Sequence, residues 1–378
     1  MNILKQLTEF SNRYGNNPEF VLAGGGNTSA KDGDILYVKG SGIPLADITA
    51  SGFVRMDRKK LKEVLNGAYS EDTSARERGV LTALSAARMP GEENKRPSVE
   101  TSLHDMLKSK FVLHVHPPLV NGATCSVDGK KAIAELFPQA AWVDATKAGY
   151  ILAADSKKVI DDYGGKHGIQ PAVLFVENHG VFFSADTVSG LDSLVADVMD
   201  KLRCRARIIP NLSDAGYNPS LSSQAAETIR TAYLGIEGAA ATVFACNYEI
   251  ALLARNTKYF AAVEYPFTPD HIVYCRHKAL FINDALPQTV SAAFSGYRKE
   301  NGFAPKIVFV KKLGMFASGK NAREAETARD VFTDGIKIAV YAKNFGGGKF
   351  MTSGDIKFIL NWEAESYRQK ISIGNNKD

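Results

Sequence analysis

Short apolar runs alternate along the chain with glycine-rich turns and longer segments of helical spacing, a pattern typical of a mixed α/β protein. The first helical segment, up to about residue 14, has one apolar side made of Ile3, Leu4, Leu7 and Phe10. Apolar runs predict strands at 20–23, 35–38, 111–116, 140–143, 172–183, 272–282 and 307–316. Helical spacing covers 53–89 in two segments that begin near 56–57 and 72, and then 156–163, 188–207, 224–253 and 324–343.

A polar stretch at 208–223, rich in Pro, Asn and Ser, divides this pattern into two parts. Such a composition is typical of a linker between domains. With 378 residues the chain is long enough for two hydrophobic cores. We therefore expect a first domain at 1–212 and a second, smaller α/β domain at 221–378, with the last residues, GNNKD, disordered.

One segment of the first part recurs in the second. Pro171 to Ser184 reads PAVLFVENHGVFFS, and Pro305 to Ser318 reads PKIVFVKKLGMFAS, aligned without a gap and each followed by a helical pattern. Two apolar strands can share such a pattern by chance, and the alternative is a duplicated half-domain. In this alignment His179 falls opposite Leu313, so we expect a second copy to hold no metal in the way described next.

Two of the strand-like runs carry three of the seven histidines. His114 and His116 occupy alternate positions of one run, so their side chains share a face, and Pro117-Pro118 ends that run. His179 lies in the second run. A lone histidine in an apolar strand is more often a core residue, but three neutral imidazoles around one ion leave a position open, as in a catalytic zinc site. We predict one divalent metal, zinc before others, at His114, His116 and His179.

A carboxylate and two glycine-containing turns accompany these runs. Ser98 is a candidate helix N-cap, and Glu100 and His104 are four residues apart on one helical face. The turns 24–27 and 41–42 each follow a predicted strand, and such turns expose backbone N–H groups that bind anions, although plain turn chemistry is the alternative. Neither turn is a nucleotide-binding fingerprint, because G-x-G-x-x-G and G-K-[ST] are absent.

Charge and cysteine usage exclude several classes of function. The formal net charge of +5 is mild and its basic residues are spread along the chain, so we expect no nucleic-acid partner. The four cysteines are isolated, which disfavours disulfides and a cysteine zinc site and favours the reducing cytosol. The N-terminus lacks the apolar region of a signal peptide, and no apolar run reaches membrane-spanning length. We expect a cytoplasmic protein with no membrane partner.

Five motifs in order, GGGNTSAK, KGSGI, PSVETSLH, LHVHP and ENHGVF, resemble the class II aldolase/adducin family over about residues 18–207. TPDH at 268–271 and LGMFASGKNAREA at 313–325 look like the second portion of the aldolase region in bifunctional rhamnulose-1-phosphate aldolase/alcohol dehydrogenases. The resemblance implies a class II aldolase-like α/β/α domain with a central, mostly antiparallel sheet, followed by a degenerate aldolase-like domain. Those longer proteins continue into a short-chain dehydrogenase, which this sequence does not reach, so we expect no NAD chemistry.

The resemblance also implies roles for individual residues. His114, His116 and His179 match the family's zinc ligands, Glu100 its catalytic acid/base, and His104 the histidine one turn later. The family's phosphate cradle matches Gly26, Asn27, Ser41, Gly42 and Ser98. In two places the sequence departs from the family. Val99 stands where the aldolases usually have a second serine, and the tyrosine that protonates the leaving aldehyde in some members has no match, Tyr150 being only nearby in sequence.

These roles imply a zinc-dependent class II aldolase, a carbon–carbon lyase of carbohydrate metabolism. It would cleave a ketose 1-phosphate of the rhamnulose or fuculose type to dihydroxyacetone phosphate and an aldehyde. A pentulose-phosphate 4-epimerase, which shares the retro-aldol step, and a non-catalytic adducin-like interaction module are the alternatives. The intact histidine triad argues against the module. The expected partners are a small sugar phosphate and further copies of the chain, in a dimer or tetramer.

Overall fold

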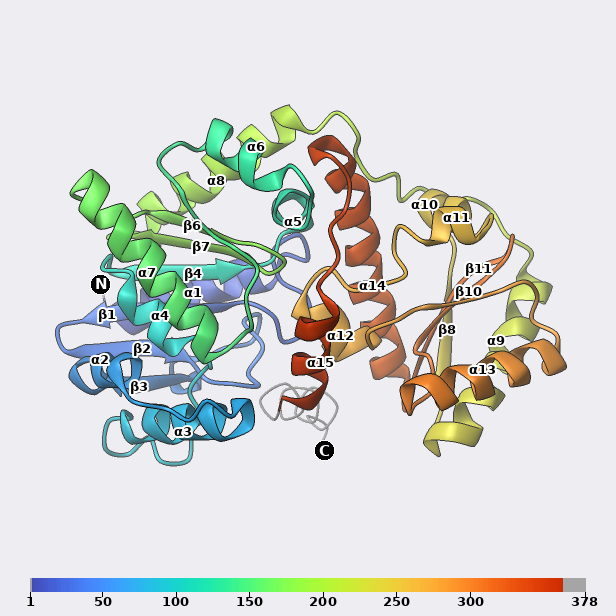
Figure 1. The fold of residues 1–378 in the computed structure, drawn as a ribbon, viewed down its shortest axis with the longest axis horizontal. Coiled ribbons are helices and arrows are strands. Elements are labelled where there is room, and N and C mark those ends of the chain that lie inside the picture. The colour runs from blue at the N-terminus through green and yellow to red at the C-terminus, as the bar shows by residue number, and fades with distance from the viewer. Residues whose placement is uncertain (1, 363–378) are drawn as a thin grey trace.

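The computed structural model describes residues 2–362, which form two β-sheets with helices packed on their faces (Figure 1). The larger sheet has seven strands in the order β3-β2-β1-β4-β7-β6-β5, and the smaller has four in the order β8-β11-β10-β9. Neighbouring strands are antiparallel except in the pairs β5–β6 and β9–β10. The predicted fold class, a mostly antiparallel central sheet with a second smaller α/β part, is therefore confirmed. The strands are β1 (Asn27–Asp32), β2 (Ile35–Lys39), β3 (Phe53–Asp57), β4 (Phe111–Val115), β5 (Ala141–Val143), β6 (Val173–Val176), β7 (Gly180–Ala185), β8 (Ala241–Ala245), β9 (Leu280–Ile282), β10 (Ile307–Val310) and β11 (Gly314–Gly319).

The helices connect and cover these strands. Among the described residues, no helix combines the length and the apolar character that a membrane crossing requires. The helices are α1 (Ile3–Gly15), α2 (Arg58–Asn66), α3 (Thr73–Ala86), α4 (Thr101–Met106), α5 (Pro118–Thr124), α6 (Gly129–Leu136), α7 (Tyr150–His167), α8 (Val188–Arg205), α9 (Pro219–Glu237), α10 (Tyr248–Leu253), α11 (Thr257–Phe260), α12 (Pro269–Cys275), α13 (Pro287–Asn301), α14 (Ala322–Ala342) and α15 (Ser353–Asn361), with 3-10 turns at Ala50–Gly52 and Lys343–Phe345. We call residues 3–205 the N-terminal half and residues 219–362 the C-terminal half.

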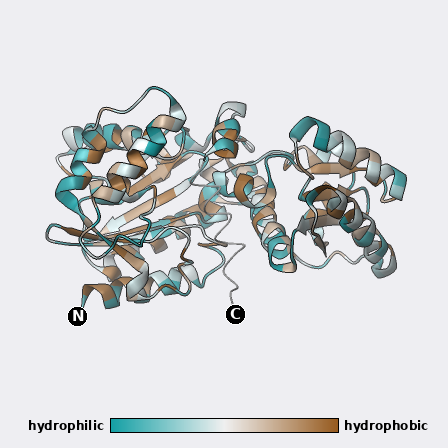
Figure 2. Ribbon diagram, turned by 90° about the horizontal axis from the view of Figure 1, so that it is seen from below, coloured by the Kyte–Doolittle hydropathy of each residue, from teal (hydrophilic) through white to brown (hydrophobic). Residues whose placement is uncertain are grey.

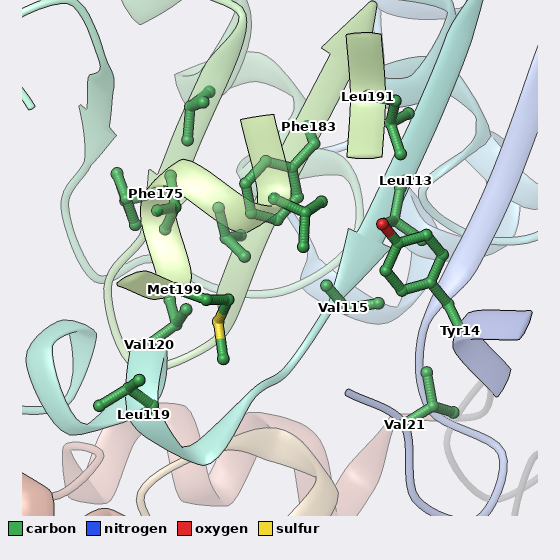
Figure 3. Packing of buried hydrophobic residues seen from close by; sticks show 14 of the residues in the cluster. Tyr14, Val21, Leu113, Val115, Leu119, Val120, Phe175, Phe183, Leu191 and Met199 are labelled. Carbon is green, nitrogen blue, oxygen red and sulfur yellow. The ribbon is translucent and has the colours of Figure 1, made fainter. Parts of the chain in front are cut away.

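Strand β4 lies at the centre of the larger sheet and is buried on both faces. Leu113 and Val115 point into a cluster with Phe183 of β7 and with α1, α5 and α8 (Figure 3). Val112, with the opposite orientation, packs against α4 and α7. This burial on both faces explains the continuous apolar run in the sequence, and each buried Leu, Val or Phe contributes about 1.5–3 kcal/mol. Hydropathy colouring shows the apolar strands inside and polar residues on the outer sides of the helices (Figure 2).

The smaller sheet is also covered by helices on both faces. Helices α9 and α13 pack on one face, and α12 and α14 pack on the other. Helix α14 lies between the two sheets, in contact with β8 and β11 on one side and with α5 on the other (Figure 1). Gly122 of α5 permits this close approach, because a Cβ at Gly122 would lie 2.3 Å from Cβ of Tyr341. The two halves therefore share an extended helical interface.

The smaller sheet repeats the order, direction and register of four strands of the larger one. The order β8-β11-β10-β9 corresponds to β4-β7-β6-β5, and the last pair is parallel in each sheet. Val176 pairs with Gly180 as Val310 pairs with Gly314. This agreement supports the duplicated half-domain and the division into two domains, which both stay predictions.

The strand predicted at 20–23 is wrong, because those residues lie in turns and an irregular segment, and the strand of this region is β1. β1 reads NTSAKD, yet its side chains are mostly buried. They are stabilised by hydrogen bonds: Ser29 Oγ lies 2.9 Å from His104 Nδ1, and Lys31 Nζ donates to the Ser109 carbonyl at 3.0 Å. Apolar periodicity does not detect a buried strand of this kind.

Other differences lie at strands hidden in predicted helices. β3 begins the segment 53–89, and β8 interrupts the segment 224–253. The alanines of β8, which reads ATVFA, favour a helix and so mask the strand. The predicted strand 272–282 starts instead as α12, because Thr268 and Pro269 provide an N-cap and a first helical residue, and only Leu280–Ile282 is a strand. The terminal GNNKD lies outside the described residues.

Candidate metal centre and active site

The three predicted histidine ligands meet at one end of the larger sheet. His114 lies near the end of β4, His116 just beyond it, and His179 in the turn between β6 and β7. The Nε2 atom of His114 lies 2.9 Å from Nε2 of His116 and 3.2 Å from Nε2 of His179. Ligands of a tetrahedral zinc ion with Zn–N bonds of 2.0–2.1 Å stand about 3.3 Å apart. The spacing therefore fits one metal ion between the three rings.

Hydrogen bonds at the opposite ring nitrogens orient two of these imidazoles. Nδ1 of His114 lies 3.0 Å from the Val181 carbonyl oxygen, and Nδ1 of His116 lies 2.8 Å from a carboxylate oxygen of Asp270. Both partners accept a proton, so each Nδ1 donates and each Nε2 keeps its lone pair for a ligand bond. Burial lowers the pKa of His114 to about 4, which favours the neutral form that binds metals. His114 also stacks on Phe182 of β7, with ring centroids 3.9 Å apart.

Glu100 faces the same point from the start of α4. Its Oε1 atom lies 3.3 Å from Nε2 of His114 and 3.0 Å from Nε2 of His179. This oxygen is buried and accepts no hydrogen bond, whereas Oε2 accepts one from the Asn27 amide at 2.5 Å. Burial alone would raise the pKa of the Glu100 carboxyl. The adjacent imidazoles of His114 and His179 lower this pKa by more than burial raises it, so it lies well below its usual range. The imidazole nitrogens of His114, His116 and His179, with the Glu100 carboxylate beside them, form a donor set that suits a divalent cation.

His104 does not reach the cavity, although it is one turn from Glu100. Its side chain is fully buried, with Nδ1 2.9 Å from Ser29 Oγ and Nε2 against the side-chain oxygen of Asn27. Asn27 in turn holds Glu100, so His104 acts on the carboxylate only through Asn27. Ser98 is not the helix N-cap that was expected: Glu100 occupies that position, and the Ser98 hydroxyl accepts the Glu100 backbone N–H at 3.2 Å.

The residues matched to a phosphate cradle lie together beside Glu100. They line a cavity of about 50 Å³, and their members are Gly26, Asn27, Ser41, Gly42 and Ser98. The backbone N–H groups of Gly24 and Ser41 are already bonded, to the Tyr274 hydroxyl at 3.1 Å and to the Arg96 carbonyl at 2.8 Å. The expected nest of free N–H groups is thus smaller than the turns suggested. Lys39, only 5% exposed, lines the same cavity and adds a positive charge.

Several lining residues were missed by sequence reasoning. Pro269, Asp270 and Trp362 come from the C-terminal half and lie on the rim of this cavity. Asp270 belongs to the TPDH stretch, so a signal for it existed, whereas nothing in the local pattern marked Trp362. Val99 lies between this cavity and a larger neighbouring cavity of about 480 Å³. Tyr150 lines only the larger one, and its hydroxyl lies 3.5 Å from the Leu65 carbonyl.

Comparison with known proteins assigns the N-terminal half to a family. Residues 5–190 match the model of the class II aldolase and adducin N-terminal domain. The uncharacterized oxidoreductase YuxG of Bacillus subtilis (strain 168) is 20% identical over 413 residues, a match that covers 98% of this chain and 58% of that protein. The chain therefore spans little more than half the length of this relative.

Two solved structures resemble the chain over about half its length. The N-terminal class II aldolase domain of a conserved protein from Thermoplasma acidophilum has 24% identity and a TM-score of 0.46, covering 54% of this chain and 93% of that one. An L-fuculose 1-phosphate aldolase has 17% identity and a TM-score of 0.37, covering 53% and 84%. Through its residues 5–190, the chain belongs to the class II aldolase and adducin family.

Proposed function

We propose that the protein is a metal-dependent aldolase that cleaves a ketose 1-phosphate to dihydroxyacetone phosphate and an aldehyde. The observation that carries this proposal is the position of Glu100. Its Oε1 is buried, accepts no hydrogen bond, and lies 3.0 Å from His179 and 3.3 Å from His114. A binding module does not need a buried carboxylate directed at three metal-binding nitrogens, whereas an enzyme that moves a proton beside a metal does.

His114, His116 and His179 would hold the metal, for which we propose zinc. When bound, a divalent cation supplies Lewis-acid stabilisation of the negative charge that develops on the ketone side during carbon–carbon cleavage. Residues of the protein carry out the proton transfer. Oε1 of Glu100 takes and returns the proton of the donor fragment, while Asn27 holds Oε2 at 2.5 Å. His104, behind Asn27, keeps this amide in place.

The substrate phosphate would bind on the side of the cavity away from the histidines. We propose that Ser41 and Ser98 offer hydroxyl groups there, that Gly26 and Gly42 let the backbone approach, and that Lys39 supplies charge. Gly26 has φ +65° and Gly42 φ +84°, conformations that other residues rarely adopt. Val99 provides no hydroxyl, so we expect one phosphate contact fewer than the family's usual cradle would make.

A screen of ketose 1-phosphates tests this function, with release of dihydroxyacetone phosphate as the signal. The rhamnulose and fuculose compounds come first. Release of dihydroxyacetone phosphate supports the aldolase, and a metal-replete protein that releases none from any ketose 1-phosphate opposes it. Analysis of sugar products separates the 4-epimerase alternative, since an epimerase recombines the fragments and returns a sugar phosphate. Purified protein without bound metal would favour the adducin-like module.

We also propose a cytosolic homo-oligomer. The four cysteines are all unpaired in the structure, which agrees with a reducing compartment. The C-terminal half covers part of the N-terminal half in the same chain, so we expect a dimer rather than a tetramer. Light scattering of the purified protein measures the number of chains. A monomer would contradict the expected assembly, but not the proposed chemistry.

A further inference from the structure

The C-terminal half reaches into the candidate metal centre of the N-terminal half. Asp270, in the first turn of α12, lines the cavity beside Glu100 and His179. Its Oδ2 atom lies 2.8 Å from Nδ1 of His116. Both side chains are largely buried, with exposures of 17% for His116 and 15% for Asp270. The contact joins segments that are far apart in the sequence and belong to different halves.

His116 depends on this contact in a way that His114 does not. His114 lies within β4, where the Val181 carbonyl of the paired strand β7 accepts its Nδ1 proton at 3.0 Å. His116 lies one residue past β4, and its own backbone N–H donates to the Phe20 carbonyl at 3.2 Å. The Nδ1 atom of its ring instead contacts the Asp270 carboxylate from the other half.

The surroundings hold Asp270 in place. α12 begins at Pro269, and Nδ1 of His271 accepts the Thr268 backbone N–H at 3.2 Å, which fixes the start of the helix. α12 packs on α14, and α14 packs on α5, which directly follows His116 and Pro117 in the chain. Gly25 leaves room for the carboxylate, since a Cβ there would lie 3.0 Å from Asp270 Oδ2. The carboxylate therefore has a defined position relative to His116.

We propose that Asp270 is a positioning residue of the metal centre, supplied by the C-terminal half to the histidine at the end of β4. It fixes His116 as the Nδ1–H tautomer and holds the ring with Nε2 toward His114 and His179. The contact also makes Nε2 a more basic, stronger metal ligand. The inference rests on the proposed metal site. It gives the C-terminal half, which has Leu313 where the N-terminal half has His179, a role in completing that site.

Binding of Co²⁺ to the full, metal-stripped chain tests this role without any use of activity. Affinity is measured by competition with a chromophoric chelator, and the cobalt absorption spectrum reports the geometry of the ligands. Asp270→Ala is expected to bind Co²⁺ about 10–100-fold more weakly, with an altered spectrum, as loss of an outer partner of a ligand histidine does. Asp270→Asn keeps an acceptor for the Nδ1 proton and should recover part of this loss.

Two further variants separate positioning from general damage. Asp270→Ser is too short to reach His116 but keeps a polar residue in α12, so it serves if the Ala variant does not fold. Glu19→Gln removes another ion pair between the halves, Lys337 Nζ to Glu19 Oε1 at 2.7 Å, and should leave Co²⁺ binding unchanged. An equal loss in Glu19→Gln, or wild-type affinity and spectrum in the Ala or Ser variant, overturns the role of Asp270. A wild-type chain that binds no Co²⁺ removes the metal centre itself, and with it the proposed function.

Discussion

His179 and Leu313 occupy matching positions in the turns that join β6 to β7 and β10 to β11. The backbone N–H of each donates to the carbonyl three residues earlier, that of Val176 at 3.2 Å and that of Val310 at 3.0 Å. The residue before each has a positive φ, 53° at Asn178 and 60° at Lys312. The same turn therefore presents an imidazole in the N-terminal half and an apolar side chain in the C-terminal half.

Replacing His179 with leucine gives the N-terminal half the side chain that the C-terminal half has. We expect His179→Leu to fold, because Leu313 shows that the turn accepts leucine, and to lose bound metal and activity. Removing the hydrogen-bond partner of a ligand histidine lowers metal affinity ~10–100-fold, and His179→Leu should lower it by more because the variant removes a direct ligand. Metal analysis after dialysis measures it. His167→Ala, an exposed histidine at the end of α7, is the control, and full metal occupancy in His179→Leu would refute the ligand assignment.

Glu100→Gln should keep the fold and the metal but lose most of its activity. The amide retains the shape and the contact with Asn27 but no longer takes a proton. Loss of a positioned acid/base costs about 10²–10⁴-fold in rate. The measurement is the turnover number of the metal-loaded variant at saturating substrate, beside its metal content. Wild-type turnover in this variant would remove Glu100 from the mechanism.

Gly180, the first residue of β7, leaves the space that two of the histidine rings fill. A Cβ there would lie 2.6 Å from Cδ2 of His116 and 3.3 Å from Cε1 of His114. We expect Gly180→Ala to displace both rings and weaken metal binding. Gly165→Ala in α7 is the matched control, because a Cβ at Gly165 meets no atom within 4 Å. Equal metal affinity in the two variants would show that the rings tolerate the displacement.

Lys31 in β1 is a buried lysine whose pKa is lowered to about 7, mainly by burial. An unfolded lysine has a pKa near 10.4, so between about pH 7 and 10 the unfolded chain binds more protons at this residue. The contribution of Lys31 to the free energy of unfolding therefore rises with pH in this range, by at most about 1.4 kcal/mol per pH unit, and is constant below it.

Lys31→Met should accordingly flatten the pH dependence of stability. Thermal unfolding midpoints of the wild type and the variant, compared at pH 7 and pH 9, measure this. From pH 7 to pH 9, the unfolding midpoint of the wild type should change in favour of the folded state by more than that of the variant. The groups that act on Lys31 are Asp105, Arg58 and Asp186, all present in both proteins. A parallel pH dependence in the two proteins would mean that Lys31 stays charged in the folded state.

The parts of the fold that could be predicted are those whose side chains follow a simple apolar period. β4, β6, β7, β10 and β11 are buried on both faces, so each reads as an apolar run. β1 could not be predicted this way, since hydrogen bonds rather than apolar side chains make its burial favourable. β8 was hidden because alanine favours helices, and pairing with β11 overrides that preference.

Some residues of the candidate site could likewise be predicted from the sequence, and others could not. His114 and His116 could be paired from the two-residue period of a strand, and His179 was a third histidine in another apolar run. Helical spacing brought Glu100 forward, and the family resemblance gave it the acid/base role. The contact of Asp270 with His116 depends on how α12 packs against the N-terminal half, which local sequence does not encode. The position of His104 behind Asn27 likewise follows from the packing of α4 on β1. Spacing along a helix placed it one turn from Glu100 but gave no information about which face meets the cavity.

A metal titration of activity tests the central claim most directly. Metal-stripped protein is supplied with increasing Zn²⁺, and release of dihydroxyacetone phosphate from a ketose 1-phosphate that the enzyme accepts is measured at each point. The histidine triad of the N-terminal half and its leucine-bearing counterpart in the C-terminal half predict no activity without metal and a linear rise that ends at one metal ion per chain. Undiminished cleavage by the metal-free protein, or a rise that ends only at two ions per chain, would contradict this account.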